Sequence, residues 1–436
     1  MEHKQNPSVT WAVWIPTLWL TLISSRDLAF WLGRGDADPG TGSPYQRAFL
    51  LLLCCLSLIV LYGRRFDWYK AIKDNIWMIM LVLYMFASIF WSHNAPYISL
   101  KRWVKELIPV VMALVVLSED NPRNAVASVL RRSIYVLIPF SLLLVICFPD
   151  YGVESFGSLE AWIGVTTHKN ALGRLCSISV CFLVWAFFNR WLARDGVSLR
   201  YQAYTDMFVL GLALYLLKGP GIGKTVSITS AASLVIGLAM FFGLIWMRKL
   251  KRYLGVKTLK TVTVAIIVLG TATVFIGGLV VGGDIVSSLG REETLTGRTE
   301  IWAKLMPFAM KEPIIGHGIG GFFTDEMQKS LGNLPHAHNG YMDVILDYGF
   351  VGLFFVSMFL LSFCGKAHKT LYYDYAWGSL MLCLLYMTVI YNVAEPSVDS
   401  LTRQHMAVLI LASVSSLANS EYRSDTNDMP PMRAAI

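Results

Sequence analysis

Charged residues are scarce in this sequence. Asp, Glu, Lys and Arg make up 15% of its 436 residues, whereas hydrophobic residues make up 55% and the mean hydropathy is +0.53. A soluble globular domain usually carries about 25% charged residues. The deficit excludes an ordinary soluble domain and indicates a polytopic membrane protein.

Paired cysteines are also lacking, since no two of the seven have C-x-x-C spacing. All seven fall in apolar runs: Cys54, Cys55, Cys147, Cys176, Cys181, Cys364 and Cys383. We therefore expect small packing residues, with neither a disulfide framework nor a zinc site built from cysteine.

Basic segments with interleaved aromatic residues are absent too, so no nucleic-acid partner is expected. The net charge of +8 fits attraction to the anionic headgroups of membrane lipids.

Long apolar runs, by contrast, are abundant. A bilayer core about 30 Å thick takes roughly 20 mostly apolar residues per helix. The runs lie near 9–25, 46–62, 76–91, 103–117, 133–148, 170–188, 205–217, 227–247, 261–281, 345–364, 372–393 and 403–418. They predict an all-α polytopic membrane protein with about 12 transmembrane helices. The first run follows Lys4 without a small-residue cleavage site, so we expect a retained span and not a removed signal peptide.

The distribution of lysine and arginine predicts the orientation. These residues accumulate on the cytoplasmic side of membrane proteins, and with both termini inside, more than half of the 37 fall there. A basic cluster at 248–260 fixes the middle of the chain. Residues 1–281 then form transmembrane helices 1–9, residues 282–347 one large loop outside the cytoplasm, and residues 345–418 helices 10–12. The polar segment 419–436 is expected to be a cytoplasmic tail.

The loop at 282–347 is long for a compact protein, and such loops are usually functional. Within it, "TGRTEIWAKLMPFAMKEP" places apolar residues at helical spacing, which predicts an amphipathic helix on the membrane surface or against the helix bundle. Pro313 is expected to end this helix. A glycine-rich turn, "GHGIGGFF", follows.

Histidine concentrates on the outer side, which indicates that the working face lies there. Six of the eight histidines are placed at that face: His93, His168, His317, His336, His338 and His405. Histidine is the side chain best suited to proton transfer near neutral pH.

The stretch "NLPHAHNGYMDVILDYG" is the most concentrated of the outer polar segments. Asn339, Asp343 and Asp347 recur at i, i+4 and i+8, on one face of the helix that enters the tenth span. His338 is expected in the first turn of that helix, where free backbone N–H groups and the helix dipole favour an anion. His336 and His338 are also possible metal ligands with Asp343 as the best third, but histidines at i, i+2 are weak evidence and we expect no metal.

Further charged and polar residues lie at the outer ends of other spans. Ionisable groups inside a membrane cost about a few kcal/mol each, so those that persist are functional candidates. They are Arg102, Lys105 and Glu106 before the fourth span, His168, Lys169, Asn170 and Arg174 before the sixth, and Glu395, Asp399 and Arg403 around the last connection. Snorkelling to headgroups is the alternative, and it fits Arg102 and Arg403 better than Lys105 and Arg174.

Two strings imitate known motifs. "KGPGIGKT" (218–225) resembles a phosphate-binding P-loop, but Lys218 stands where the pattern needs glycine and no strand precedes it, so no nucleotide is expected. "GDAD" (35–38) resembles the acidic pair with which some membrane glycosyltransferases hold a divalent metal. Its glycine and proline neighbours favour a solvated turn instead.

Four motifs together carry a family resemblance. "THKNALGRL", "TGRTEIW", "PIIGHGIGGF" and "HAHNGYMDVILDYGFVGL" follow one another over roughly residues 167–355. In order and placement they resemble the signature of the O-antigen ligase/polymerase superfamily. The H-x-H-N form, the chain length and the single large outer loop are more similar to the ligases than to the polymerases.

The resemblance implies a fold and an activity. It implies a GT-C-like membrane glycosyltransferase that needs no metal or other cofactor and acts at the periplasmic face of a Gram-negative inner membrane. Its substrates would be O-antigen linked to undecaprenyl diphosphate and the lipid A core oligosaccharide. The family's essential histidine maps onto His338 and its loop arginine onto Arg298. Many members carry a further arginine where this chain offers Lys218 and Lys224, so the third cation stays open.

The chemistry of such a transfer assigns roles to the candidates. His338 is the expected general base for the attacking hydroxyl, oriented by Asp343 or Asp347, and a single displacement would invert the anomeric centre. Arg298 is expected to bind the departing diphosphate through its planar fork. The other donor-binding candidates are Lys105, Lys169, Arg174 and Arg102. The supporting candidates are His336, Asn339, Asp343, His317 and His168.

Two other functions remain open from the sequence. A polymerase of the same superfamily would use the same donor with a lipid-linked acceptor. A transporter or lipid flippase would also have about 12 spans, but it would more typically show repeat symmetry between its halves, which this sequence does not.

Overall fold

The protein is almost entirely helical. The computed structural model describes residues 9–34, 43–64, 67–156, 159–193, 198–219, 227–250, 254–280 and 296–415. Across these residues a short antiparallel hairpin, β1 (Val153–Phe156) with β2 (Leu159–Trp162), is the sheet structure. The predicted all-α polytopic membrane class is confirmed.

The helices that precede the hairpin lie in about the first third of the chain. They are η1 (Trp11–Val13), α2 (Trp14–Ile23), α3 (Leu28–Trp31), α4 (Pro44–Tyr62), α5 (Trp68–Asp74), α6 (Ile76–Ala87), η2 (Ser88–Trp91), α7 (Pro96–Leu117), α8 (Pro122–Cys147) and α9 (Pro149–Gly152). The helices after the hairpin are α10 (Lys169–Ala193), α11 (Ser198–Lys218), α12 (Ile228–Lys249), α13 (Val256–Val280), α14 (Thr296–Lys311), α15 (Asp325–Ser330), α16 (Gly340–Tyr373), α17 (Tyr375–Tyr391) and α18 (Gln404–Ser415).

The described residues of the twelve predicted apolar runs lie mainly on these helices. The runs 9–25 and 76–91 each combine an α-helix with a short 3-10 helix, and the run 372–393 begins at the end of α16 and continues on α17. Six helices in the described part are long and apolar enough to cross a membrane: α4, α8, α10, α12, α13 and α16. A seventh span results if α5 and the segment from α6 to η2, bent by 83° at their junction, cross together. Shorter apolar helices end at Ile23, Tyr391 and Val414. Twelve crossings and a GT-C-like arrangement stay predictions.

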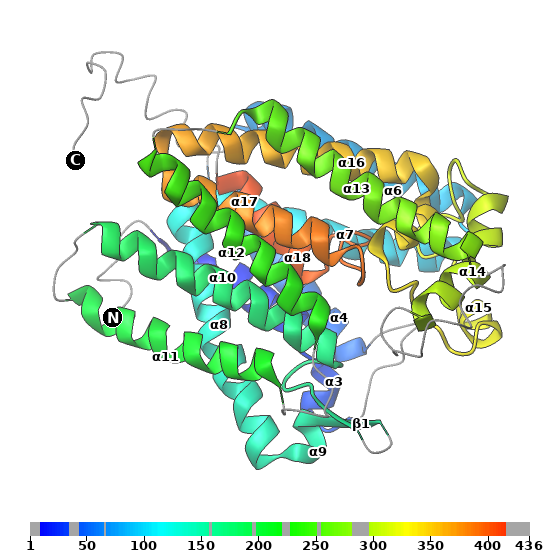
Figure 1. Ribbon diagram of the computed structural model, residues 1–436, viewed down its shortest axis with the longest axis horizontal. Helices are drawn as coiled ribbons and strands as arrows, with labels where there is room; N and C mark the ends of the chain where they lie inside the picture. Colours follow the sequence, from blue (N-terminus) through cyan, green and yellow to red (C-terminus); the bar gives the residue numbers. More distant parts are fainter. Residues whose placement is uncertain are drawn as a thin grey trace.

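The helices are packed around α17 (Figure 1). This helix lies between α16 and α13 on one side and α10 and α12 on the other, and it contacts all four. Leu380, Leu382 and Leu385 are completely buried, as expected for a helix that is apolar all round. On α4, by contrast, Leu58 and Ile59 are 59% and 68% exposed, which suits a surface that faces lipid.

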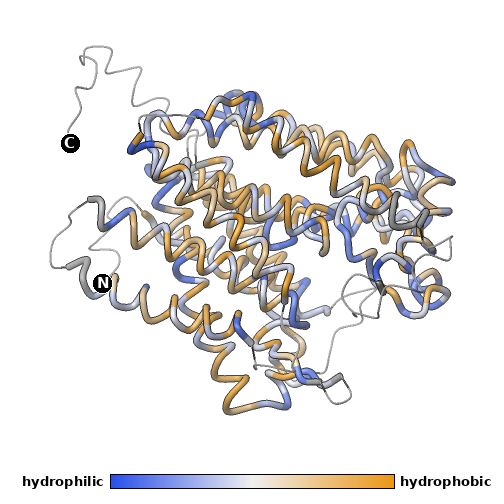
Figure 2. Tube along the Cα trace, in the orientation of Figure 1, coloured by the Kyte–Doolittle hydropathy of each residue, from blue (hydrophilic) through white to orange (hydrophobic). Residues whose placement is uncertain are grey.

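Polar residues gather at the ends of the bundle, whereas the helix middles are hydrophobic (Figure 2). One end carries α14 and α15 together with the starts of α10 and α16. This is the end that the sequence places outside the cytoplasm.

Helix α14 is the predicted amphipathic helix, and it ends at Lys311, before Pro313. Its apolar face, with Trp302 and Leu305, is buried against Ile345 and Leu346 of α16. Of the two predicted locations, the structure therefore shows packing against the bundle. The indole nitrogen Nε1 of Trp302 also donates to the carbonyl oxygen of Ala337 at 2.9 Å, which ties the helix to the histidine segment.

The glycine-rich turn docks into a break in α16. Gly349 has φ +64° inside this helix, and a Cβ there would lie 2.2 Å from the carbonyl oxygen of Ile314. Glycine is required because both the positive φ and the close backbone approach exclude a side chain. The freed N–H groups of Phe350 and Val351 donate instead to the carbonyls of Pro313 and Ile314, at 2.8 and 3.1 Å.

Several sequence features lie outside the described residues. They are the "GDAD" string (35–38), residues 220–225 of the P-loop-like string with Lys224, the start of the long loop (282–295) and the tail (419–436).

Candidate functional site

A buried carboxylate stands at the centre of the outer polar end. Glu395, in the connection between α17 and α18, is 2% exposed. Its oxygen Oε1 accepts from the amide of Asn170 at 2.7 Å and from the guanidinium of Arg298 at 2.9 Å. The same oxygen lies 3.2 Å from Nδ1 of His338. Residues from α10, α14, the start of α16 and the last connection thus meet at one carboxylate.

Two asparagines fix the backbone around this carboxylate. Asn339 caps α16, because its side-chain oxygen accepts from the N–H groups of Tyr341 and Met342 at 3.0 and 3.1 Å. Its amide nitrogen donates to the carbonyl of Val393 at 2.9 Å, next to Glu395 in the chain. The carbonyl of Asn392 in turn accepts from the N–H of Gly340 at 2.9 Å. The start of α16 and the last connection are therefore fastened together.

His338 lies one residue before the N-cap of α16, not in the first turn as predicted. Asn339 is the N-cap, and His338 adopts the left-handed backbone with φ +51°. This conformation is uncommon outside glycine, and it turns the imidazole toward Glu395. The His338 side chain is 31% exposed whereas that of Glu395 is 3% exposed, so one end of the pair is open to a substrate.

The electrostatics of the cluster keep Glu395 ionised. Burial by itself would raise the pKa of this carboxyl, but the hydrogen bond with His338 and the charges of His338, His336 and Arg298 outweigh burial and lower it. Burial, followed by the charge of His338, lowers the pKa of His336 to about 3. Burial, followed by the charge of Arg174, lowers the pKa of His168 to about 4. His336 and His168 are therefore neutral imidazoles at neutral pH.

The two aspartates of the motif contact backbone, and Glu395 is the carboxylate beside His338. Asp343 accepts from the N–H of Ala337 at 2.7 Å, and Asp347 accepts from the N–H of Phe322 at 3.2 Å. Each therefore holds a turn of the long loop against α16. The expectation that Asp343 or Asp347 orients His338 is wrong in this geometry. Glu395 was visible in the sequence as a charged residue near lipid, but nothing in its spacing pointed to His338.

The predicted cations fall into different surroundings. Arg298 contacts Glu395, as described above. Arg174 is half-buried, its Nη1 lies 3.5 Å from the carbonyl of Pro396, and its Nε has no hydrogen-bond partner among the described residues. Lys169 is half-buried at the start of α10, whereas Lys105 is exposed on α7. Arg102 donates to the carbonyl of Gly320, in the glycine-rich turn.

The predicted supporting residues also lie in different places. His168 accepts from the N–H of Ala171 at 3.1 Å and so caps the start of α10 beside Asn170. The His336 ring packs edge-on against the His338 ring, with centroids 4.3 Å apart. His317 belongs to a different cluster, with His93 and Glu312.

His336, His338 and Glu395 are one set of possible metal ligands. One ligand atom from each lies within 4.8 Å of the other two, so the third ligand would be Glu395 and not Asp343. The carboxylate is however already paired with the guanidinium of Arg298, whose positive charge opposes a second cation. The arrangement suits proton transfer and anion binding better than metal binding.

The class that these features define is a polytopic membrane protein with a histidine–carboxylate–arginine cluster at the end of the bundle that carries α14 and α15. Residues 221–357 match a family model described as O-antigen ligase, and this stretch includes Arg298 and His338. The chain is also 25% identical over 366 residues to the exopolysaccharide production protein ExoQ of Rhizobium meliloti (strain 1021), a match that covers 79% of this chain and 78% of the relative.

Both matches support the resemblance to the O-antigen ligase/polymerase superfamily that the four motifs carry. Members of the matched family are membrane enzymes of glycosyl transfer, and the family suggests lipid-linked polysaccharide substrates.

Proposed function

We propose that the protein is an O-antigen ligase. It transfers O-antigen polysaccharide from undecaprenyl diphosphate to a sugar hydroxyl of the lipid A core, at the periplasmic face of the inner membrane. No nucleotide takes part, because the diphosphate linkage already stores the energy, and arginines take the place of a metal ion in stabilising the departing diphosphate. The observation that carries this proposal is the cluster of His338, Glu395 and Arg298 at the outer end of the bundle.

His338 is the general base of this reaction. Its Nδ1 faces the ionised Glu395, so Nδ1 carries the proton and Nε2 holds the lone pair. Nε2 takes the proton of the acceptor hydroxyl while the hydroxyl oxygen forms its bond to the anomeric carbon of the donor. Glu395 stabilises the resulting imidazolium, as a buried carboxylate does beside a catalytic histidine.

Arginine side chains bind and stabilise the leaving diphosphate. The bond from the anomeric carbon to the diphosphate oxygen breaks, and undecaprenyl diphosphate departs with the electron pair. Arg298 can chelate two phosphate oxygens, and Arg174 offers a half-buried guanidinium that lies 3.5 Å from the carbonyl of Pro396, the residue after Glu395. Lys169 and Arg102 lie farther along the same outer face, where they would attract the anionic donor. A single displacement of this kind inverts the anomeric configuration.

The gene deletion tests the activity directly. Lipopolysaccharide electrophoresis of the deletion strain is expected to show no polysaccharide ladder, while full-length chains accumulate on the lipid carrier. Accumulation of single lipid-linked repeat units would instead identify a polymerase. An unchanged ladder with no accumulated intermediate would remove both functions and favour transport. Retention of configuration in the product linkage would contradict the single displacement.

A polymerase is the second candidate, and one observation favours it. The curated relative is named for exopolysaccharide production, not for lipopolysaccharide ligation. A polymerase would use the same base and the same arginines, with a lipid-linked sugar as the acceptor.

A further inference from the structure

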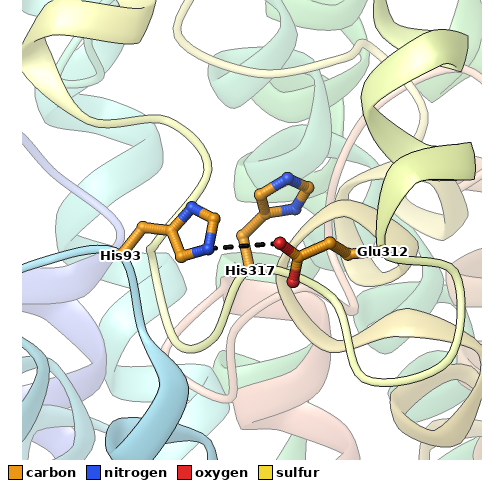
Figure 3. A group of neighbouring side chains, drawn as sticks. All are labelled: His93, Glu312 and His317. Atoms are coloured by element: carbon orange, nitrogen blue, oxygen red, sulfur yellow. Dashed lines mark ion pairs between the residues drawn. The ribbon is translucent and has the colours of Figure 1, made fainter.

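A second histidine cluster lies on the outer side of the bundle (Figure 3). His93 follows η2, Glu312 follows α14, and His317 lies in the glycine-rich turn. Three segments that are distant in the sequence therefore bring two imidazoles and one carboxylate to the same place. The proposed transfer reaction uses none of them.

The backbone already holds these segments together. The N–H of His93 donates to the carbonyl of His317 at 3.0 Å, and the N–H of His317 donates to the carbonyl of Leu346 at 3.0 Å. A Cβ at Gly318 would lie 2.4 Å from Cα of Ser92, so the turn is pressed against the segment that carries His93. The side chains converge because of this packing, not because of their own attraction.

The side-chain distances fit a small, tightly coordinated cation. One ligand atom from each of the three residues lies within 4.8 Å of the other two. His93 Nε2 and Glu312 Oε1 are 3.4 Å apart, and a tetrahedral zinc with bonds near 2.0–2.1 Å separates its ligand atoms by about 3.3 Å. His93 and Glu312 have side chains that are 48% and 30% exposed, so both can rotate to close on an ion.

The His317 ring is oriented by a second hydrogen bond. Its Nδ1 lies 2.8 Å from the carbonyl oxygen of Leu346, which also accepts from the backbone N–H of His317. Metal-ligating histidines commonly donate their other ring nitrogen to a backbone carbonyl in this way. His317 is 4% exposed, which makes it the rigid member of the set.

We propose that His93, Glu312 and His317 form a zinc site. Imidazole and carboxylate ligands suit Zn²⁺, and three protein ligands leave a fourth position for water. The ion would fasten the segment after η2 to the glycine-rich turn. Since that turn also contacts Arg102 and Asp347, the ion would stabilise the outer end on which the transfer site is built. This inference does not depend on the proposed activity.

Zinc titration of the full-length protein in detergent tests the site. The tag-free protein is depleted with a chelator and then titrated with zinc sulfate, with bound zinc measured by elemental analysis and Tm by thermal unfolding. We expect one zinc per chain and a Tm that rises with zinc concentration, because the ion binds the folded state. No bound zinc, or no change in Tm on binding, would overturn the proposal.

Variants locate the ion. His93→Ala and Glu312→Gln change exposed or half-exposed side chains, and each should weaken zinc binding at least about tenfold. His336→Ala, which alters the other histidine cluster, is the matched control and should bind zinc as the unmodified protein does. Equal binding by His93→Ala and the unmodified protein would overturn the assignment, as would loss of zinc in His336→Ala.

Discussion

The two histidine clusters of the outer end contain the same types of ligand but differ in their counter-charges. In the first, Glu395 is buried and is paired with Arg298 and Asn170 as well as His338. In the second, Glu312 is 30% exposed and faces His93, with Lys311 as a nearby cation. A carboxylate already neutralised by arginine suits proton transfer beside an anionic substrate, whereas a carboxylate facing two imidazoles suits a divalent cation.

Removing the base of the first cluster should have the largest effect. His338→Ala is expected to lower transfer by about 10²–10⁴-fold, which is the usual contribution of a general base. The measurement is restoration of the polysaccharide ladder in the deletion strain, with membrane expression checked by immunoblot. Lys329→Ala, an exposed change on α15 at the same end, is the matched control. Normal restoration by His338→Ala would remove this residue as the base.

Glu395 and Asp343 can be compared directly as partners of His338. Glu395→Gln keeps the shape of the side chain but removes the charge that stabilises the imidazolium, so we expect transfer to fall by about 10–10³-fold. The acid limb of the pH–rate profile should also move to lower pH, because protonated His338 loses its counter-charge. Asp343→Asn retains an oxygen for the N–H of Ala337 and should leave the profile in place.

The opposite result would restore the sequence-based expectation. If the pH profile moved in Asp343→Asn and stayed unchanged in Glu395→Gln, the aspartate of the motif would be the positioning residue. A purely structural role of Glu395 would lower the rate without moving the profile.

The comparison explains what the sequence could predict. The apolar runs and the amphipathic helix follow local patterns, and the helices confirm them. The HAHN motif as a site and the outward grouping of histidine stay predictions. Glu395 could not be paired with His338 from the sequence, because the contact joins residues 57 positions apart through the packing of α16 against α17.

The structure places His338 two residues before Gly340, the first helical residue, for a local reason. The sequence favoured a helix start at the histidine, but Asn339 caps the helix better since its amide oxygen accepts two backbone N–H groups. The separation of His317 from the HAHN motif could not be predicted from the sequence either. The position of His317 depends on the break in α16 at Gly349. At this break the backbone before the glycine-rich turn pairs with α16, and the turn itself packs against the segment after η2.

Removing the positive charge of Arg298 should turn the first cluster, which contains His336, His338 and Glu395, into a cation site. Arg298→Gln removes the guanidinium that pairs with Glu395, so this carboxylate becomes available as a third ligand beside His336 and His338. We expect this variant to bind one more zinc per chain than the unmodified protein in the same titration. His336→Ala in the Arg298→Gln background should abolish the extra site. An unchanged stoichiometry would show that arginine is not what distinguishes the clusters.

The smallest expected effect is on stability at acid pH. His336 and His168 have pKa values lowered to about 3 and about 4, whereas an unfolded histidine titrates near 6.5. Below about pH 6.5 the unfolded chain therefore binds protons that the folded protein does not, and stability falls as the pH decreases, by at most about 1.4 kcal/mol per pH unit for each histidine. We expect Tm in detergent to decline between pH 7 and pH 5. His168→Asn offers an oxygen to the N–H of Ala171 and removes one titrating group, so its decline should be shallower; equal slopes would show that His168 does not contribute.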